Sequence, residues 1–215
     1  MKPTRFETAI ALIDKANSED INTYEVAGIQ YPKELLYSQR MTRKLLQFKP
    51  DASKALQIAA RAQHICRWKI ARNEYPMDRV GYFKWRETLK KMHADLTEDI
   101  LKQVGYDNEY IDRIRKIILK KLIKKNDESQ ALEDTICLVF LDYYFEEFAA
   151  KHPDEKVIDI LQKTWVKMSD KGQQEALKLN FSEKSLALEI LKPLIKITSK
   201  REIKTFFIQL SMWEQ

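Results

Sequence analysis

The residues best suited to chemistry lie together in one segment, Ala59-Ala60-Arg61-Ala62-Gln63-His64-Ile65-Cys66-Arg67-Trp68, which continues to Arg72. We expect this segment to be one continuous helix. At 100° per residue, its apolar face carries Leu56, Ala59, Cys66 and Ile70. His64 lies well round from that face, and its neighbours there are Arg61, Arg67 and Trp68. Packing alone would not require these residue types, so we predict that this second face forms half of a site for an anion.

A second tryptophan–arginine pair, Trp85-Arg86, repeats the chemistry of Arg67-Trp68. Arginine can hold a phosphate or carboxylate through two parallel hydrogen bonds, and tryptophan can cover a ring or an apolar part of a ligand. The other interpretation places the tryptophans in the core. We predict a ligand-binding set that consists of Arg61, Arg67, Trp68, Arg72, Trp85 and Arg86.

A further histidine and two acids could complete this site. His93 falls on the apolar stripe of the next expected helix, where it is either a hydrogen-bonded core residue or a metal ligand. Glu133 and Asp134 lie in the first turns of a later helix. They either stay at its solvated rim and favour its N-terminus, or meet a cation. Imidazole nitrogens and a carboxylate from separate helices can hold a divalent ion. We therefore predict His64, His93 and Asp134 as metal ligands, with Glu133 as the catalytic base or as a supporting group.

Composition points to an all-α protein. The chain has 215 residues, of which 44% are hydrophobic, and this is enough for one substantial core. Its 4 glycines and 6 prolines are too few for the turns of a many-stranded sandwich or barrel. No apolar run reaches the ~18 residues of a membrane span, and the N-terminus is not typical of a signal peptide. We expect a cytoplasmic protein in which Cys66 and Cys137 are buried, reduced thiols.

Helix signals follow one another along most of the chain. The expected helices span about residues 4–17, 32–46, 51–75, 81–104, 108–122, 128–150 and 153–169, with a loop near 22–28. The helix over 128–150 is apolar nearly all round between Thr135 and Phe148, so we expect it to be the central element. We predict a core domain over 1–170. Short helices over 171–215 would pack on that core within the same domain, with Ser182 and Ser199 as N-caps.

A basic run from Arg113 to Lys125 has a single acid, Asp112, beside it. It is either a solvated helix face or a surface that binds phosphates, whose affinity would fall with salt. The net charge of +6 is compatible with both interpretations.

Several blocks of the sequence resemble the domain-of-unknown-function 4202 family. The blocks are Pro-Lys-Glu-Leu-Leu-Tyr-Ser-Gln-Arg-Met-Thr at 32–42, Ala-Arg-Ala-Gln-His-Ile-Cys-Arg-Trp, Gly81-Tyr82 with Trp85-Arg86, His93-Ala94-Asp95, Leu132-Glu133-Asp134 with Leu138-Val139-Phe140-Leu141, and Lys163-Thr164-Trp165. The resemblance covers about residues 5–185. Some members are labelled glutamyl-tRNA synthetase. This chain has too few strand signals and glycines for the parallel sheet of such an enzyme, so we do not expect it to be one.

The order of His64, His93 and Asp134 is also distantly similar to the HD superfamily of metal-dependent phosphohydrolases. That resemblance implies a helical bundle around a divalent metal (Mn, Mg, Fe or Zn). The adjacent His-Asp doublet of those enzymes is absent, because Asp95 follows His93 by two residues and 200° of helix rotation. We therefore expect Asp95 at the surface.

Three functions are compatible with the sequence. The first is an HD-like protein that binds a small phosphorylated or nucleotide-like ligand and, with a metal, hydrolyses a phosphoester. The second is a non-catalytic binding module that has lost the metal. The third is an RNA-binding protein that uses the 113–125 face, and nucleic acid is not the favoured partner. The sequence favours a small anionic ligand, predicts no membrane association and leaves the oligomeric state open.

Overall fold

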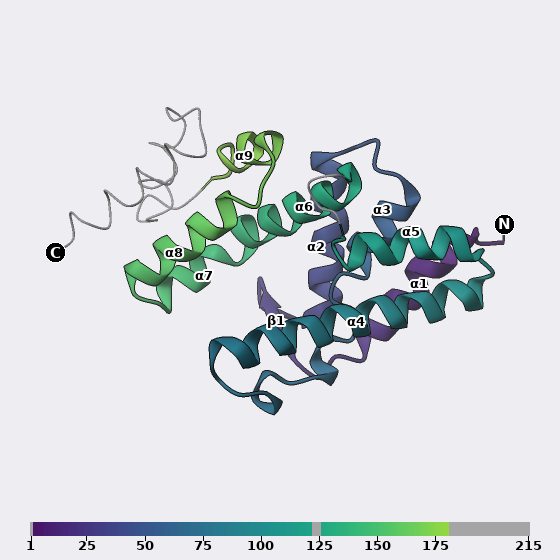
Figure 1. Cartoon of the computed structure of the whole chain (residues 1–215), viewed down its shortest axis with the longest axis horizontal. Coiled ribbons are helices and arrows are strands. Elements are labelled where there is room, and N and C mark those ends of the chain that lie inside the picture. Colours follow the sequence, from purple (N-terminus) through teal and green to yellow (C-terminus); the bar gives the residue numbers. More distant parts are fainter. Residues whose placement is uncertain (1, 122–125, 181–215) are drawn as a thin grey trace. The chain divides into compact units, whose positions relative to one another are not determined.

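The computed structural model describes residues 2–121 and 126–180, and over these it is mostly α-helical (Figure 1). The chain divides into two compact units, Met1–Leu132 and Glu133–Gln215. The prediction of an all-α protein is confirmed. The predicted division at residue 170 stays a prediction, and the expected caps Ser182 and Ser199 lie outside the described residues.

Unit 1 is a bundle of helices with one short hairpin. Its elements are α1 (Arg5–Ser18), β1 (Thr23–Val26), β2 (Ile29–Pro32), α2 (Lys33–Phe48), α3 (Lys54–Arg61), the 3-10 turns η1 (Arg67–Lys69) and η2 (Arg72–Glu74), α4 (Arg79–Val104), α5 (Asn108–Ile118) and the start of α6 (Asp127–Tyr143). α4 packs against α1 and α5, while α3 packs against α1, α2 and α5. The core lies between these helices and includes Ile13, Met41, Leu45, Leu56 and Ile114.

Local sequence explains where most of these helices begin and end. Thr4 and Glu7 form a capping box at the start of α1, and Asp107 caps α5. Gly105 adopts the left-handed conformation after α4 and ends it, as predicted. Asp78 caps α4 by accepting a hydrogen bond from the Gly81 N–H.

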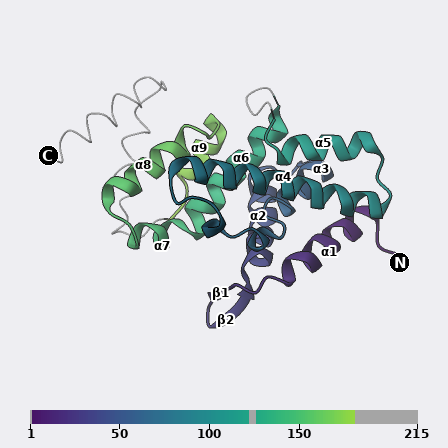
Figure 2. The same cartoon turned by 60° about the horizontal axis from the view of Figure 1, so that its bottom comes forward.

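The expected loop near 22–28 is instead a β-hairpin. β1 and β2 pair antiparallel, with Tyr24 opposite Tyr31 and Val26 opposite Ile29. Ala27 and Gly28 form the two-residue turn, and both have positive φ, which matches the twist of a tight hairpin. Figure 2 shows the hairpin beyond the N-terminal end of α2.

The prediction of one helix from residue 51 to residue 75 was wrong. α3 ends at Arg61, and the chain passes through turns before η1 and η2. Distant side chains bind the backbone that a continuing helix would have used. His93 bonds the carbonyl of Ile65, and Asn17 accepts a hydrogen bond from the N–H of Cys66. Cys66 itself has a φ of 53°, which no α-helix accommodates.

Unit 2 is described from Glu133 to residue 180 and contains the rest of α6, followed by α7 (Phe145–Ala150), α8 (Asp154–Trp165) and α9 (Asp170–Ala176). The helix expected over 128–150 is broken at Tyr144, whose φ and ψ are −129° and −14°. Between residues 131 and 141, α6 is buried on almost every side, as its apolar sequence predicts. Cys66 and Cys137 are both buried thiols outside any disulfide. Among the described helices, none is long and apolar enough to span a membrane.

Candidate functional site

The candidate site in unit 1 centres on Glu34, a buried carboxylate at the start of α2 that lies against His64. His64 sits on the turn that follows α3, and its Nδ1 is 3.3 Å from Oε2 of Glu34. The Glu34 side chain is only 6% exposed, whereas that of His64 is 27% exposed. Tyr37, one turn further along α2, stacks on the imidazole with ring centroids 4.1 Å apart. The carboxylate therefore holds Nδ1 as a donor, and Nε2 is the nitrogen that can exchange a proton with a ligand.

Two cations act on this pair. Nη1 of Arg67 is 3.7 Å from Oε1 of Glu34. Burial lowers the pKa of His64 and Glu34 raises it, while Arg67 and Lys120 lower it further, so that the net shift is downward. Burial raises the pKa of Glu34, but the His64 hydrogen bond and the charge of Arg67 bring it below its usual value. The result is an ionised buried carboxylate beneath a neutral, partly exposed imidazole.

His93 lies behind His64 and is held by the backbone. Its Nδ1 is 2.8 Å from the carbonyl oxygen of Ile65, so this nitrogen donates and Nε2 carries the lone pair. The His64 and His93 rings are 5.9 Å apart and are tilted by 34°. Burial, together with the charge of His64, lowers the pKa of His93 to about 3. His93 is therefore neutral at physiological pH.

The backbone beside His64 is held in a sparsely populated conformation. Cys66 has positive φ, and its N–H donates to Oδ1 of Asn17 at 3.0 Å. Lys120, whose charge reaches His64, has a φ of 55°. Left-handed backbone at non-glycine residues costs free energy and often occurs at functional sites. The contacts of Asn17 and His93 fix the backbone turn at Ile65 and Cys66, and this turn positions the side chain of His64.

Arg67, Arg72 and Trp85 form the outer part of the site. The Arg67 guanidinium lies over the Trp85 ring at 4.9 Å, and that of Arg72 lies over the same ring at 5.9 Å. Trp85 Nε1 donates to the Ile70 carbonyl at 3.0 Å, which fixes the ring. Three of the six predicted ligand-binding residues thus lie together in unit 1.

The other three lie elsewhere in unit 1. Trp68 is half-buried in η1. Arg86 is exposed on α4, and its Nη1 is bonded to the Tyr82 hydroxyl at 3.2 Å. Arg61 forms two hydrogen bonds of 2.6 Å to the carboxylate of Asp14 and so ties α3 to α1. Arg61 therefore has an evident structural role, and ligand binding by these three stays a prediction.

The predicted acids belong to unit 2, and Asp134 has local partners there. Its carboxylate accepts hydrogen bonds from the backbone N–H and the hydroxyl of Ser169, at 2.7 and 2.6 Å. These bonds fix the start of α9, which Ser169 caps. Glu133 is also buried. Within residues 2–121 and 126–180, no group of three or more His, Cys, Asp or Glu side chains could hold a metal ion. The metal set of His64, His93 and Asp134, with Glu133 as base, stays a prediction.

Acids pair with much of the basic run that begins at Arg113. Arg113 binds Glu128, Arg115 binds both Asp95 and Glu98, and Lys116 binds Asp112. Asp95 is therefore a surface residue, as expected. Lys124 and Lys125 lie outside the described residues.

Sequence reasoning missed Glu34, Tyr37 and Lys120. A signal for Glu34 exists, because it lies seven residues before Met41 and eleven before Leu45, on the stripe that faces the core. An acid on an apolar stripe needs a buried partner, and a search for that partner would have led to a histidine or arginine. Tyr37 and Lys120 carry no comparable signal.

The depressed pKa of His93 predicts a pH-dependent stability. In the unfolded chain histidine titrates near pH ~6.5, so the unfolded state binds a proton below that pH while native His93 does not. Stability is complete above pH ~6.5 and falls as the pH drops toward 3. Between pH 6.5 and 5, we expect the free energy of unfolding to fall by up to about 2 kcal/mol from this residue.

Urea unfolding at several pH values measures this effect. His93→Asn retains a donor near the position of Nδ1 and removes the titration, so its stability should depend less on pH over the same range. The charged and titratable groups that act on His93 (His64, Glu34 and Arg67) are unchanged in that variant. An unaltered slope in His93→Asn would refute a neutral, buried His93.

The comparisons with known proteins identify a family. The sequence profile of the family described as "Domain of unknown function (DUF4202)" matches residues 7–188. This range includes Glu34, His64, Arg67, Trp85 and His93. Neither a curated protein nor a solved structure matches the chain. The chain belongs to the DUF4202 family.

Proposed function

We propose that unit 1 binds the phosphate group of a small phosphorylated or nucleotide-like ligand at the Glu34–His64 pair. The observation that carries the proposal is a partly exposed imidazole fixed by a buried carboxylate and acted on by two cations, Arg67 and Lys120. A protonated phosphate oxygen can donate a hydrogen bond to the unprotonated Nε2 of His64. The Arg67 side chain is 32% exposed, and its guanidinium can supply charge-assisted hydrogen bonds.

The arrangement suits an anion better than a cation or an apolar ligand. The Glu34 carboxylate, which lies against His64, is already engaged by His64 and Arg67. Trp85 carries a guanidinium over its ring and is mostly buried, so it presents a fixed support to the arginines. A ligand bound at His64 would therefore lie within the positive field of Arg67 and Lys120.

Titration with inorganic phosphate, phenyl phosphate and adenosine monophosphate tests the proposal. Binding is followed by the NMR signals of His64 and of the Trp85 indole. Arg67→Gln should weaken binding about tenfold or more, because a hydrogen bond to a charged group contributes about 1.5–3 kcal/mol. Lys156→Gln, which neutralises an exposed lysine of unit 2, is the matched control and should bind normally. If none of the three compounds perturbs either signal, the proposal is wrong.

A second candidate function is metal-dependent phosphoester hydrolysis. The observation in its favour is that both imidazoles are held through Nδ1, His64 by a carboxylate and His93 by a carbonyl. Histidines that bind metals are commonly oriented in this way, with Nε2 as the ligand atom. In this proposal Nε2 of His64 and Nε2 of His93 would be the ligand atoms that unit 1 supplies. A divalent ion would lower the pKa of a bound water and so supply the hydroxide for hydrolysis.

Elemental analysis and a phosphoester panel test this second candidate. We expect the protein to bind about one equivalent of Mn²⁺ and to hydrolyse a phosphoester. EDTA should abolish this hydrolysis because it removes the metal. His93→Asn should lose both properties, whereas His152→Asn, on a histidine of unit 2, should keep them. If neither metal binding nor turnover occurs, unit 1 is a binding module without a metal. The proposal of phosphate binding is independent of this result, because it is tested by the phosphate titration described above.

A further inference from the structure

A strip of alternating arginines and aromatic rings runs outward from the phosphate site proposed above. We name it the arginine–aromatic strip and define it as Arg67, Trp85, Arg72, Tyr82, Arg79 and Phe83. Arg67 joins Glu34 to the Trp85 ring. Arg72 lies over both Trp85 and Tyr82, at 5.9 Å from each ring centroid. The neighbouring Phe83 ring carries the Arg79 guanidinium at 5.7 Å.

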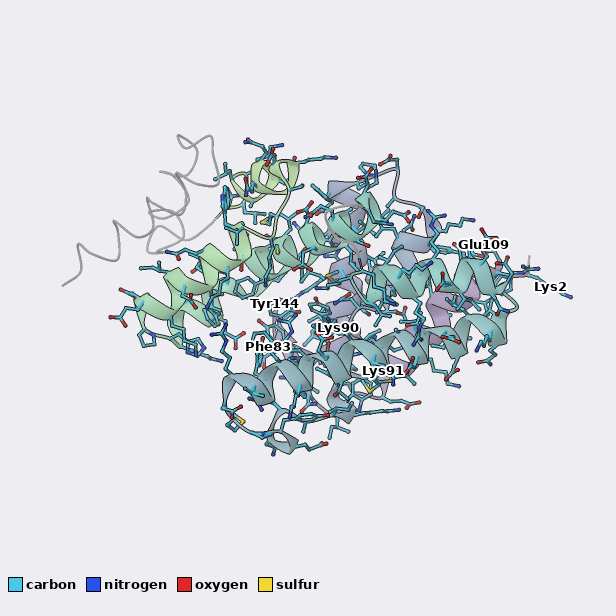
Figure 3. The ribbon with its side chains drawn as sticks, in the orientation of Figure 1. Lys2, Phe83, Lys90, Lys91, Glu109 and Tyr144 are labelled. Atoms are coloured by element: carbon cyan, nitrogen blue, oxygen red, sulfur yellow. The ribbon has the colours of Figure 1, made fainter. Side chains whose placement is uncertain are left out.

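The outer end of the strip is exposed. Phe83 is 53% exposed and Tyr82 is 39% exposed, and beside them Val80 and Met77 are 61% and 77% exposed. Figure 3 labels Phe83, Lys90 and Lys91 in order along α4. Large apolar side chains that gather at a surface commonly mark a binding site.

The charge of this region is strongly positive. Residues 67–91 contain eight lysines and arginines and three acids. Each of the three acids has a local partner. Asp78 caps α4, Glu74 accepts the N–H of Ala71, and Glu87 pairs with Lys90. The exposed aromatic rings are therefore surrounded by positive charge.

The inner part of the strip is rigid. Arg72 donates to the backbone carbonyls of Tyr75 and Asp78, at 3.0 and 3.2 Å, so its guanidinium has a fixed place. Trp85 is held by its bond to Ile70. A flat group that stacks on the strip would meet ordered partners and would lose less binding free energy to ordering them.

We infer that the arginine–aromatic strip binds single-stranded nucleic acid whose terminal phosphate occupies the Glu34–His64 site. Unpaired bases stack on aromatic rings and guanidinium planes, while the phosphates between them need cations at short intervals. The strip supplies both in alternation and leads to a phosphate site. An anionic membrane would use the exposed end at Met77–Phe83 but could not follow the strip to the buried Trp85. This inference rests on the proposed function, because it names the ligand class of the same site.

Fluorescence anisotropy with the full chain tests the inference. The probes are labelled ten-nucleotide oligouridylates that carry a 5′-phosphate, a 3′-phosphate or no terminal phosphate, and a duplex of the same length. We expect the single strands to bind better than the duplex, and one of the two phosphorylated strands to bind best. The logarithm of the association constant should fall with the logarithm of the salt concentration, with a slope of about −0.7 for each phosphate contacted.

Variants of the exposed end separate this inference from the proposed function. Phe83→Ala and Tyr82→Ala should each weaken oligonucleotide binding about five- to fiftyfold, as expected for the loss of a stacked base. Arg79→Gln should reduce the salt slope by about 0.7. All three should bind inorganic phosphate normally. Ile21→Ala and Lys156→Gln are surface controls at residues that do not belong to the strip, and they should change neither binding reaction.

Three results would overturn the inference. The first is binding of inorganic phosphate or adenosine monophosphate without measurable binding of any oligonucleotide, which would leave the proposed function intact. The second is oligonucleotide binding that is insensitive to Tyr82 and Phe83, or equal with and without a terminal phosphate. The third is that the wild-type chain binds anionic vesicles but no single strand, and that the strip variants lose this vesicle binding. If the wild-type chain binds neither inorganic phosphate nor any oligonucleotide, the proposed function is contradicted as well.

Discussion

Burying a carboxylate costs several kilocalories per mole unless donors or cations meet it. Glu34 is such a group, placed on the core-facing side of α2. Its partners are His64 and Arg67, and both lie on the segment that follows α3. If α3 continued as a helix, His64 and Arg67, three residues apart, would still lie on one face. The carbonyl of Ile65 would then accept a backbone hydrogen bond within the helix. Because it is bonded by His93 instead, the segment turns, and the imidazole of His64 lies against both Glu34 and Tyr37.

The same constraint links stability to function in unit 1. The contacts that fix the turn come from α1 through Asn17, from α2 through Glu34 and from α4 through His93. Three helices thus hold one short segment, and Cys66 accepts a left-handed backbone as a result. Sites held from several elements keep their geometry when a ligand arrives, so less binding free energy is spent on ordering them. The neutral state of both imidazoles follows from burial and from the nearby cations, and it leaves His64 able to accept a proton.

The periodicity of apolar residues and the shortage of glycine predicted the all-α fold and most helix ends, such as the stop at Gly105. Local signals could not predict where α3 ends, because its end depends on Asn17 and His93, which are far away in sequence. The hairpin had a weak signal in the alternation of Tyr24, Val26, Ile29 and Tyr31, but a two-residue Ala-Gly turn is not among the strongest hairpin signals.

Within the site, residue type identified His64, Arg67, Arg72 and Trp85, because these side chains are chemically distinctive wherever they occur. It did not identify Glu34, since an acid in the first turn of a helix is ordinarily explained by the helix dipole. Asp134 illustrates the opposite case. Its type suggested a metal ligand, and metal binding there stays a prediction; the role that the structure shows for its carboxylate is to bind Ser169 at the start of α9.

Glu34 holds His64 in the tautomer that leaves Nε2 able to accept a proton. Long-range ¹H–¹⁵N correlation spectra of the imidazole at pH 7.5 distinguish the two ring nitrogens directly. We expect a protonated Nδ1 and an unprotonated Nε2 in the wild-type chain, and a mixture of tautomers in Glu34→Leu, with His93 unchanged. A wild-type His64 that is protonated on Nε2, or that is indifferent to the loss of Glu34, would contradict this role of Glu34.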